Sequence, residues 1–90
     1  MEAAEAKRLL DKERLEKDVI ARIMYDRLLD GKDFSVRYLD RVTGRLVDAP
    51  YDSITADGDF FRHDESLIPM HRIREVCYKG TAVWAKRRNI

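Results

Sequence analysis

The sequence has little cysteine, proline and glycine: its 90 residues include one cysteine, two prolines and four glycines. The single thiol, Cys77, excludes an internal disulfide and a site built from several thiolates. The few glycines form no glycine-rich phosphate loop. A chain with one cysteine is expected in a reducing, intracellular compartment, the cytoplasm or the nucleus.

Long hydrophobic runs are also missing. The longest uncharged apolar stretches span a few residues, such as Ser66 to Met70, whereas a membrane span needs roughly 18. No membrane segment and no secretory signal peptide are therefore expected. The sequence also lacks a His-x-x-x-His pair and a nucleophile elbow, so it predicts neither a metal site nor a cofactor.

The composition, 44% hydrophobic and 39% charged, is that of one small folded domain with a charged surface. The net charge is only +1, but the basic residues gather at one end. Residues 66–90 contain a single acid, Glu75, and six basic residues: Arg72, Arg74, Lys79, Lys86, Arg87 and Arg88. Such a cluster favours a polyanionic partner, although a frayed basic tail is the alternative.

Residues 1–24 contain no Gly or Pro and are rich in helix-forming residues, which predicts a helix. Leu15, Val19 and Ile23 form an apolar stripe that can pack on a core. We therefore divide the chain into a charged, helical N-terminal extension (1–17), a single domain (18–87) and a tail (88–90). The part of the extension before Leu15 is expected to be solvated, and deletion of residues 1–11 is expected to leave the domain folded. The N-terminal helix could alternatively bind a protein partner.

The rest of the chain predicts short antiparallel strands. Residues 34–38 alternate apolar and polar side chains, which is typical of a half-buried strand. Thr43-Gly44 turns the chain into a strand at 45–49, with Leu46 as its core residue. A single turn is expected at 51–54. The remaining predicted strands are one opened by Asp57-Gly58 around Phe60 and Phe61, one at 66–69, and a pair at 74–79 and 81–86 joined at Gly80.

This order predicts an α+β domain, in which the N-terminal helix packs on a small curved antiparallel sheet of short hairpins. Ile73 and Val76 are three residues apart, a spacing that breaks strand alternation. A β-bulge or one helical turn after His71 is therefore expected.

Catalysis is weakly indicated. His63 and His71 could act as general base and general acid in an RNA phosphodiesterase. Nothing in their spacing places them opposite each other, so no catalytic residue is predicted.

Binding residues are better indicated. Pro69 sets an extended backbone before His71 and Arg72, and both side chains can hold a phosphate, Arg72 with two parallel N–H donors. Asp40 and Arg41 follow the first strand, where Arg41 is a second phosphate ligand and Asp40 a ligand for an arginine or a ribose hydroxyl. Alternatively, Asp40-Arg41 caps a hairpin. Trp84 fits a core better than a base-stacking surface.

Three blocks of the sequence carry a resemblance to a known family. They are Ile23-Met24-Tyr25-Asp26; Tyr38-Leu39-Asp40-Arg41 with Gly44 and Pro50; and Ile68-Pro69-Met70-His71-Arg72-Ile73 with Gly80, Val83 and Trp84. With these blocks, residues 19–87 resemble the RNA cyclic group end recognition domain. That family is known from archaeal stand-alone proteins and from eukaryotic fusions with poly(A) polymerase-like and two-histidine phosphoesterase modules.

The resemblance implies a non-enzymatic RNA-binding module that recognises RNA 3′ ends, with 2′,3′-cyclic phosphate ends among the candidates. His71 and Arg72 match the family's most characteristic pair, and Asp40 and Arg41 its earlier polar pair. With the basic cluster added, the candidate RNA-binding residues are Asp40, Arg41, His71, Arg72, Arg74, Lys86 and Arg87. The structural motif residues are Tyr25, Asp26, Tyr38, Ile68, Pro69, Ile73 and Trp84.

Overall fold

The computed structural model describes residues 1–86 and confirms the α+β class. Helices α1 (Ala3–Leu10) and α2 (Glu16–Tyr25) come first. Neither helix in this part of the chain has the length and apolar character needed to cross a membrane. The strands that follow are β1 (Phe34–Leu39), β2 (Leu46–Pro50), β3 (Ile54–Asp57), β4 (Phe60–His63), β5 (Ser66–Pro69), β6 (Ile73–Tyr78) and β7 (Thr81–Ala85).

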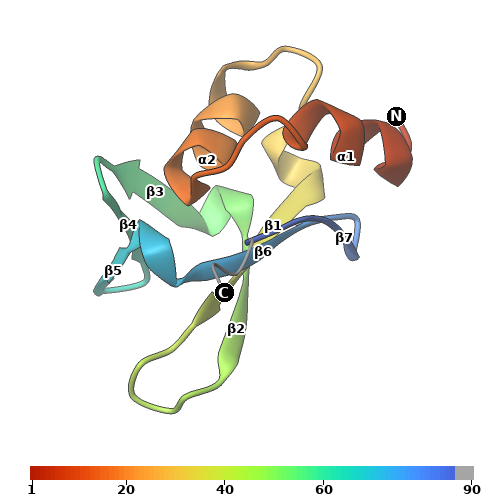
Figure 1. The fold of residues 1–90 in the computed structure, drawn as a ribbon. Helices are drawn as coiled ribbons and strands as arrows, with labels where there is room; N and C mark the ends of the chain where they lie inside the picture. The colour runs from red at the N-terminus through yellow and green to blue at the C-terminus, as the bar shows by residue number, and fades with distance from the viewer. Residues whose placement is uncertain (87–90) are drawn as a thin grey trace.

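The strands form two antiparallel sheets. The larger sheet has the order β2-β1-β6-β7, and the smaller is the meander β3-β4-β5. Helix α1 lies against β7 of the larger sheet, α2 lies between α1 and β3, and the smaller sheet stands to one side of the larger one (Figure 1). Single 3₁₀ turns precede β1, β3 and β6, namely η1 (Gly31–Asp33), η2 (Tyr51–Ser53) and η3 (Met70–Arg72).

Strand β1 shows the predicted alternation, with Phe34, Val36 and Tyr38 buried. Its pairing with β6 is irregular, because Arg37 pairs with Glu75 and Tyr38 with Ile73. Arg74 is therefore the extra residue of a bulge. A bulge reverses the alternation locally, which puts Ile73 and Val76 in the core together and confirms the predicted irregularity.

A second irregularity shapes β7. Val76 pairs with Trp84 and Cys77 with Ala82, so Val83 has no partner in the register. As a result, Val83 and Trp84 are both buried although they are adjacent. The core interpretation of Trp84 is confirmed.

The N-terminal region differs from the prediction. It forms two helices, and Ala6 and Leu10 of α1 are fully buried while Leu15 is 52% exposed. The prediction that residues before Leu15 form a solvated extension is therefore wrong for α1. Leu15 stands outside the core because it is the extended residue before α2.

One face of helix α1 is buried because it packs against β7. The Tyr78 hydroxyl donates to the Met1 carbonyl oxygen at 3.0 Å, and the Trp84 indole Nε1 donates to the Glu13 carbonyl oxygen at 2.9 Å. These bonds draw the chain back over the sheet. Since its buried residues face the core, α1 can offer a protein partner only its polar surface.

Two further details were predicted wrongly. Leu46 is 54% exposed, and Ala49 is the buried residue of β2. Because alternate residues of a strand share a face, a buried Ala49 directs Leu46 outward. Gly58 lies in the turn that leads into the strand around Phe60, as predicted, but Asp57 is the last residue of β3, a strand that the sequence analysis missed.

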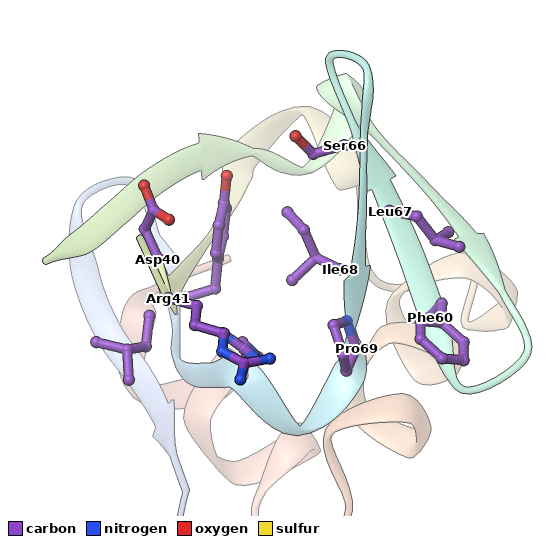
Figure 2. Close-up of a pocket in the computed structure, with 10 residues that line it drawn as sticks. Asp40, Arg41, Phe60, Ser66, Leu67, Ile68 and Pro69 are labelled. Atoms are coloured by element: carbon purple, nitrogen blue, oxygen red, sulfur yellow. The ribbon is translucent and has the colours of Figure 1, made fainter. Parts of the chain in front are cut away.

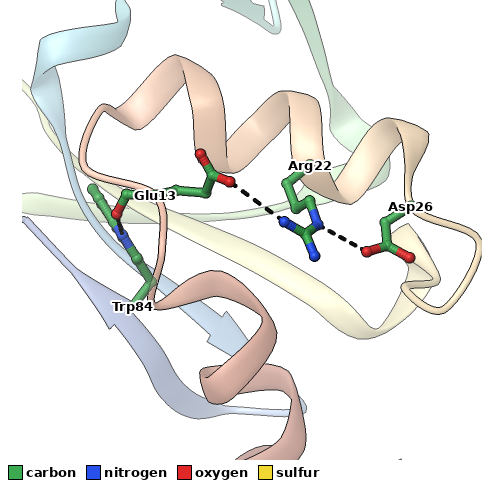
Figure 3. Close-up of polar contacts among 4 residues, drawn as sticks. All are labelled: Glu13, Arg22, Asp26 and Trp84. Atoms are coloured by element: carbon green, nitrogen blue, oxygen red, sulfur yellow. Dashed lines mark hydrogen bonds and ion pairs between the residues drawn. The ribbon is translucent and has the colours of Figure 1, made fainter.

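A polar network joins α2 to the residues that flank it, Glu13 before the helix and Asp26 after it (Figure 3). Arg22 Nε lies 2.8 Å from an Asp26 carboxylate oxygen, and another Arg22 nitrogen lies 3.4 Å from Glu13. The Leu28 backbone N–H donates to Asp26 at 2.9 Å. This bond and the Arg22 guanidinium hold the pKa of Asp26 below its ordinary value.

Deleting residues 1–11 is expected to destabilise the domain, because the deletion removes both buried side chains of α1. The substitution Leu10→Ala alone should lower the free energy of unfolding by roughly 2–5 kcal/mol, as a core truncation does. Urea unfolding followed by circular dichroism measures both. Leu9→Ala, at a half-buried position, is the milder control. Unchanged midpoints would mean that α1 does not dock on β7 in solution.

Asp26→Asn is expected to lower stability at neutral pH, because it removes the charge that Arg22 contacts. Since the folded state lowers the pKa of Asp26, its contribution is complete above the unfolded carboxyl value of about 3.9 and is lost as pH falls through the folded-state value. Urea midpoints of wild type and variant should therefore converge in acid. Asp11→Asn, at a more exposed ion pair with Lys7, is the control. A constant difference at all pH values would contradict this assignment.

Candidate nucleic-acid interface

A pocket of about 390 Å³ opens between the two sheets. Asp40 and Arg41, after β1, lie on one side, and Ile68 and Pro69 of β5 lie on the other (Figure 2). The full lining is Tyr38, Leu39, Asp40, Arg41, Phe60, Ser66, Leu67, Ile68, Pro69 and Arg72. The pocket thus combines two arginines with an apolar wall.

Tyr38 joins the sheets beside this pocket. Its hydroxyl lies 2.7 Å from His63 Nδ1 on β4. Its ring meets the Phe61 ring edge-on, with 5.3 Å between centroids. Burial, followed by the nearby carboxylates of Asp40 and Asp64, raises the pKa of Tyr38, so the hydroxyl stays neutral and can donate to the histidine.

Arg41 and Arg72 reach the pocket from separate elements. Arg41 begins the β1–β2 turn and is exposed, while Arg72 ends η3 and is half-buried. Within residues 1–86, neither side chain forms an ion pair or a hydrogen bond with another residue. Both guanidinium groups are therefore available to an anion.

Asp40 makes the hydrogen bonds of a hairpin cap. Its carboxylate accepts from the Val42 backbone N–H at 2.9 Å and from the Thr43 hydroxyl at 3.2 Å. The Gly44 N–H donates to the Asp40 carbonyl oxygen at 2.8 Å, and Gly44 takes the left-handed conformation with φ 70°. Asp40 thereby holds the turn that presents Arg41.

His71 does not lie with Arg72. It lines a different hollow, together with Leu15, Lys17 and Asp59. Successive residues of a 3₁₀ turn point about 120° apart, and η3 therefore sends these neighbouring side chains to different surfaces.

Arg74 and Lys86 gather on the His71 side. An Arg74 guanidinium nitrogen and the Lys86 ammonium both donate to the His71 carbonyl oxygen, at 2.8 and 2.9 Å. Lys86 also pairs with the buried carboxylate of Glu16 at 3.3 Å. These cations stabilise the η3 turn. Arg87, also predicted as an RNA ligand, lies outside the described residues.

Most of the predicted motif residues pack in the core, line the pocket or hold other residues in place. Ile73 and Trp84 are core residues, and Ile68 and Pro69 form the pocket wall. Asp26 and Tyr38 make the contacts given above. Tyr25 is 79% exposed.

The two histidines considered as catalytic residues occupy different surroundings. His63 is held by Tyr38, and His71 lines the separate hollow. Burial raises the pKa of the Cys77 thiol, which keeps it neutral. Within residues 1–86, no group of three or more His, Cys, Asp or Glu side chains could hold a metal ion.

Phe60, Leu67 and Ser66 line the pocket but were not predicted as site residues. A signal for Phe60 was present in the sequence. In a strand, adjacent residues face opposite sides, so one ring of the Phe60-Phe61 pair had to point outward. Phe61 is fully buried and Phe60 is 42% exposed.

Comparisons with known proteins identify the family of this small α+β domain. A family model described as the MJ1316 RNA cyclic group end recognition domain matches residues 14–86, and the chain belongs to this family. The match includes every element from α2 to β7 and omits α1.

Two relatives agree with this assignment. A UPF0248 protein of Metallosphaera sedula is 35% identical over 75 residues, which cover 81% of this chain and 94% of the relative. A UPF0248 protein of Thermococcus sibiricus is 34% identical over 73 residues, covering 79% of this chain and 84% of the relative. No solved structure matches the chain.

Tyr38→Phe is expected to destabilise the domain by about 0.5–1.5 kcal/mol, the usual net value of a hydrogen bond, because His63 loses its partner on β1. Urea unfolding measures the change. Tyr25→Phe is the matched control, since that ring is largely exposed. If both variants unfold at the wild-type midpoint, the hydroxyl contact does not hold the sheets together.

Proposed function

We propose that this chain is an RNA-binding module that recognises RNA 3′ termini, with the 2′,3′-cyclic phosphate as the preferred end, and that it binds without catalysis. The observation that carries the proposal is the pocket between the sheets, where Arg41 and Arg72 have no ion partner within residues 1–86. Membership of the end-recognition family supports it.

The chemistry of the pocket suits a terminal phosphate. An arginine offers two parallel N–H donors to phosphate oxygens, and two arginines can hold the anionic oxygens from two directions. Ile68 and Pro69 then face the ribose. A cyclic phosphate leaves no free 2′- or 3′-hydroxyl at the end, whereas a 3′-hydroxyl end presents two hydroxyl groups whose burial against an apolar wall is costly.

The pocket also suits binding without reaction. Of the described residues that line it, none is a histidine or a cysteine. Tyr38 is kept neutral by its raised pKa, and Asp40 accepts hydrogen bonds from its own turn. A proton acceptor and a proton donor poised near neutral pH, which phosphodiester cleavage needs, are not assembled there.

The other candidate basic residues are assigned a weaker role in RNA binding. His71, Arg74 and Lys86 lie across η3 from the pocket, and Lys86 is partly compensated by Glu16. We assign them a positive potential that attracts the RNA backbone. Arg41 and Arg72 are the direct ligands of the end.

The test is fluorescence anisotropy with one short RNA that ends in a 2′,3′-cyclic phosphate, a 3′-phosphate or a 3′-hydroxyl. We expect the cyclic end to bind most tightly. Arg41→Ala and Arg72→Ala should each weaken its binding by about 10- to 150-fold, the range of hydrogen bonds to charged groups, with little change in thermal stability. His71→Gln should have a smaller effect.

Arg27→Ala is the matched control, because Arg27 is exposed and lines none of the pockets described above. Three outcomes contradict the proposal. The wild type could bind no RNA, bind all three ends equally, or release a cleaved product over time.

A further inference from the structure

The outer face of the smaller sheet carries an exposed aromatic surface next to the pocket. In the β4–β5 register, Phe60 pairs with Pro69 and Arg62 with Leu67. Residues two apart on a strand share a face, so these four side chains form one surface, called here the outer face. Figure 2 shows Phe60 and Leu67 on the side of the strands opposite to Ile68.

The outer face is open and apolar. Phe60 is 42% exposed and Leu67 is 48% exposed, although the neighbouring Phe61 is fully buried. Phe60, Leu67 and Pro69 also line the pocket. The outer face and the pocket therefore share these three residues and adjoin one another.

The charges of the outer face suit a nucleotide. Arg62 is exposed and, within residues 1–86, forms no ion pair. On the neighbouring strand β3, Thr55 pairs with Arg62 and Asp57 pairs with Phe60. A phosphate is therefore favoured near Arg62 and disfavoured beside Asp57. This difference in charge favours one direction for an RNA strand that crosses the outer face.

We propose that the outer face binds the nucleotide that precedes the RNA 3′ end, with its base stacked on Phe60 and its phosphate held by Arg62. This inference rests on the proposed function, because the pocket must hold the end itself. Neighbouring strands are about 4.8 Å apart, so Phe60 on β4 lies one strand beyond the pocket wall on β5, a distance that the adjoining nucleotide can span. Aromatic side chains stack on any base, which makes the surface tolerant of sequence.

The experiment compares two ligands with the same end group: a 2′,3′-cyclic mononucleotide, which only fills the pocket, and a short RNA that ends in the same cyclic nucleotide. Stacking of one base contributes about 1–3 kcal/mol, which corresponds to about 5- to 150-fold in affinity. Because Phe60 also lines the pocket, the quantity compared is the ratio of the two affinities: Phe60→Ala should lower the affinity for the RNA, relative to that for the mononucleotide, by that factor. Arg62 is not among the residues that line the pocket, so Arg62→Ala should weaken binding of the RNA and change binding of the mononucleotide less than about twofold. Phe60→Trp should restore RNA binding.

Tyr25→Ala is the matched control, because it removes an exposed ring on α2 that does not line the pocket. Thermal unfolding checks that each variant is folded. A second measurement does not need a variant: RNA with 4-thiouridine at the second-last position should cross-link under ultraviolet light to the peptide that contains Phe60.

The outcomes separate the two proposals. If wild type binds both ligands and Phe60→Ala leaves the ratio of the RNA affinity to the mononucleotide affinity unchanged, or if the cross-link maps elsewhere, the outer face is not the second subsite and the end pocket stands. If wild type binds neither ligand, both proposals fail. If Phe60→Ala instead turns a dimer into a monomer on sedimentation without a loss of RNA affinity, the outer face joins two copies of the chain.

Discussion

The contact between Tyr38 and the β4 strand holds the two sheets together, and the candidate site depends on it. Arg41 and Arg72 belong to the larger sheet and its connections, whereas the apolar wall of Ile68 and Pro69 belongs to the smaller sheet. Small sheets bury too little surface to be stable alone. The tyrosine hydroxyl bond and the packing on Phe61 fix their relative position, and the pocket is the space that remains between them.

Irregular backbone decides which side chains share a surface. The bulge at Arg74 brings Ile73 and Val76 into the core together. One step earlier, the 3₁₀ turn η3 separates His71 from Arg72. Two residues that look like one phosphate-binding pair in the sequence therefore face two surfaces. Arg72 instead lines the same pocket as Arg41, which lies 31 positions earlier in the chain.

Much of the candidate site could be predicted from local signals. Asp40-Arg41 and Pro69-His71-Arg72 stood out as polar pairs beside turns or a proline, and the structure brings Asp40, Arg41, Pro69 and Arg72 to one pocket. Phe60 and Leu67 were not predicted, because an exposed apolar residue in a strand has the same sequence signature as a buried one. Their exposure arises because no other element of residues 1–86 covers this face of the β3-β4-β5 sheet, and a single chain segment contains no information about such a covering element.

By itself, the sequence determined the α+β class, most of the strands, the central hairpin turns and the irregularity before Val76, because turn residues and apolar periodicity act over a few positions. The tertiary structure decided which apolar residues became core. Leu10 is buried and Leu15 and Leu46 are exposed, since burial depends on what packs opposite: β7 and the Trp84 bond to Glu13 draw α1 inward. The same long-range packing brought Arg41 and Arg72 to one pocket, and this arrangement forms the candidate site.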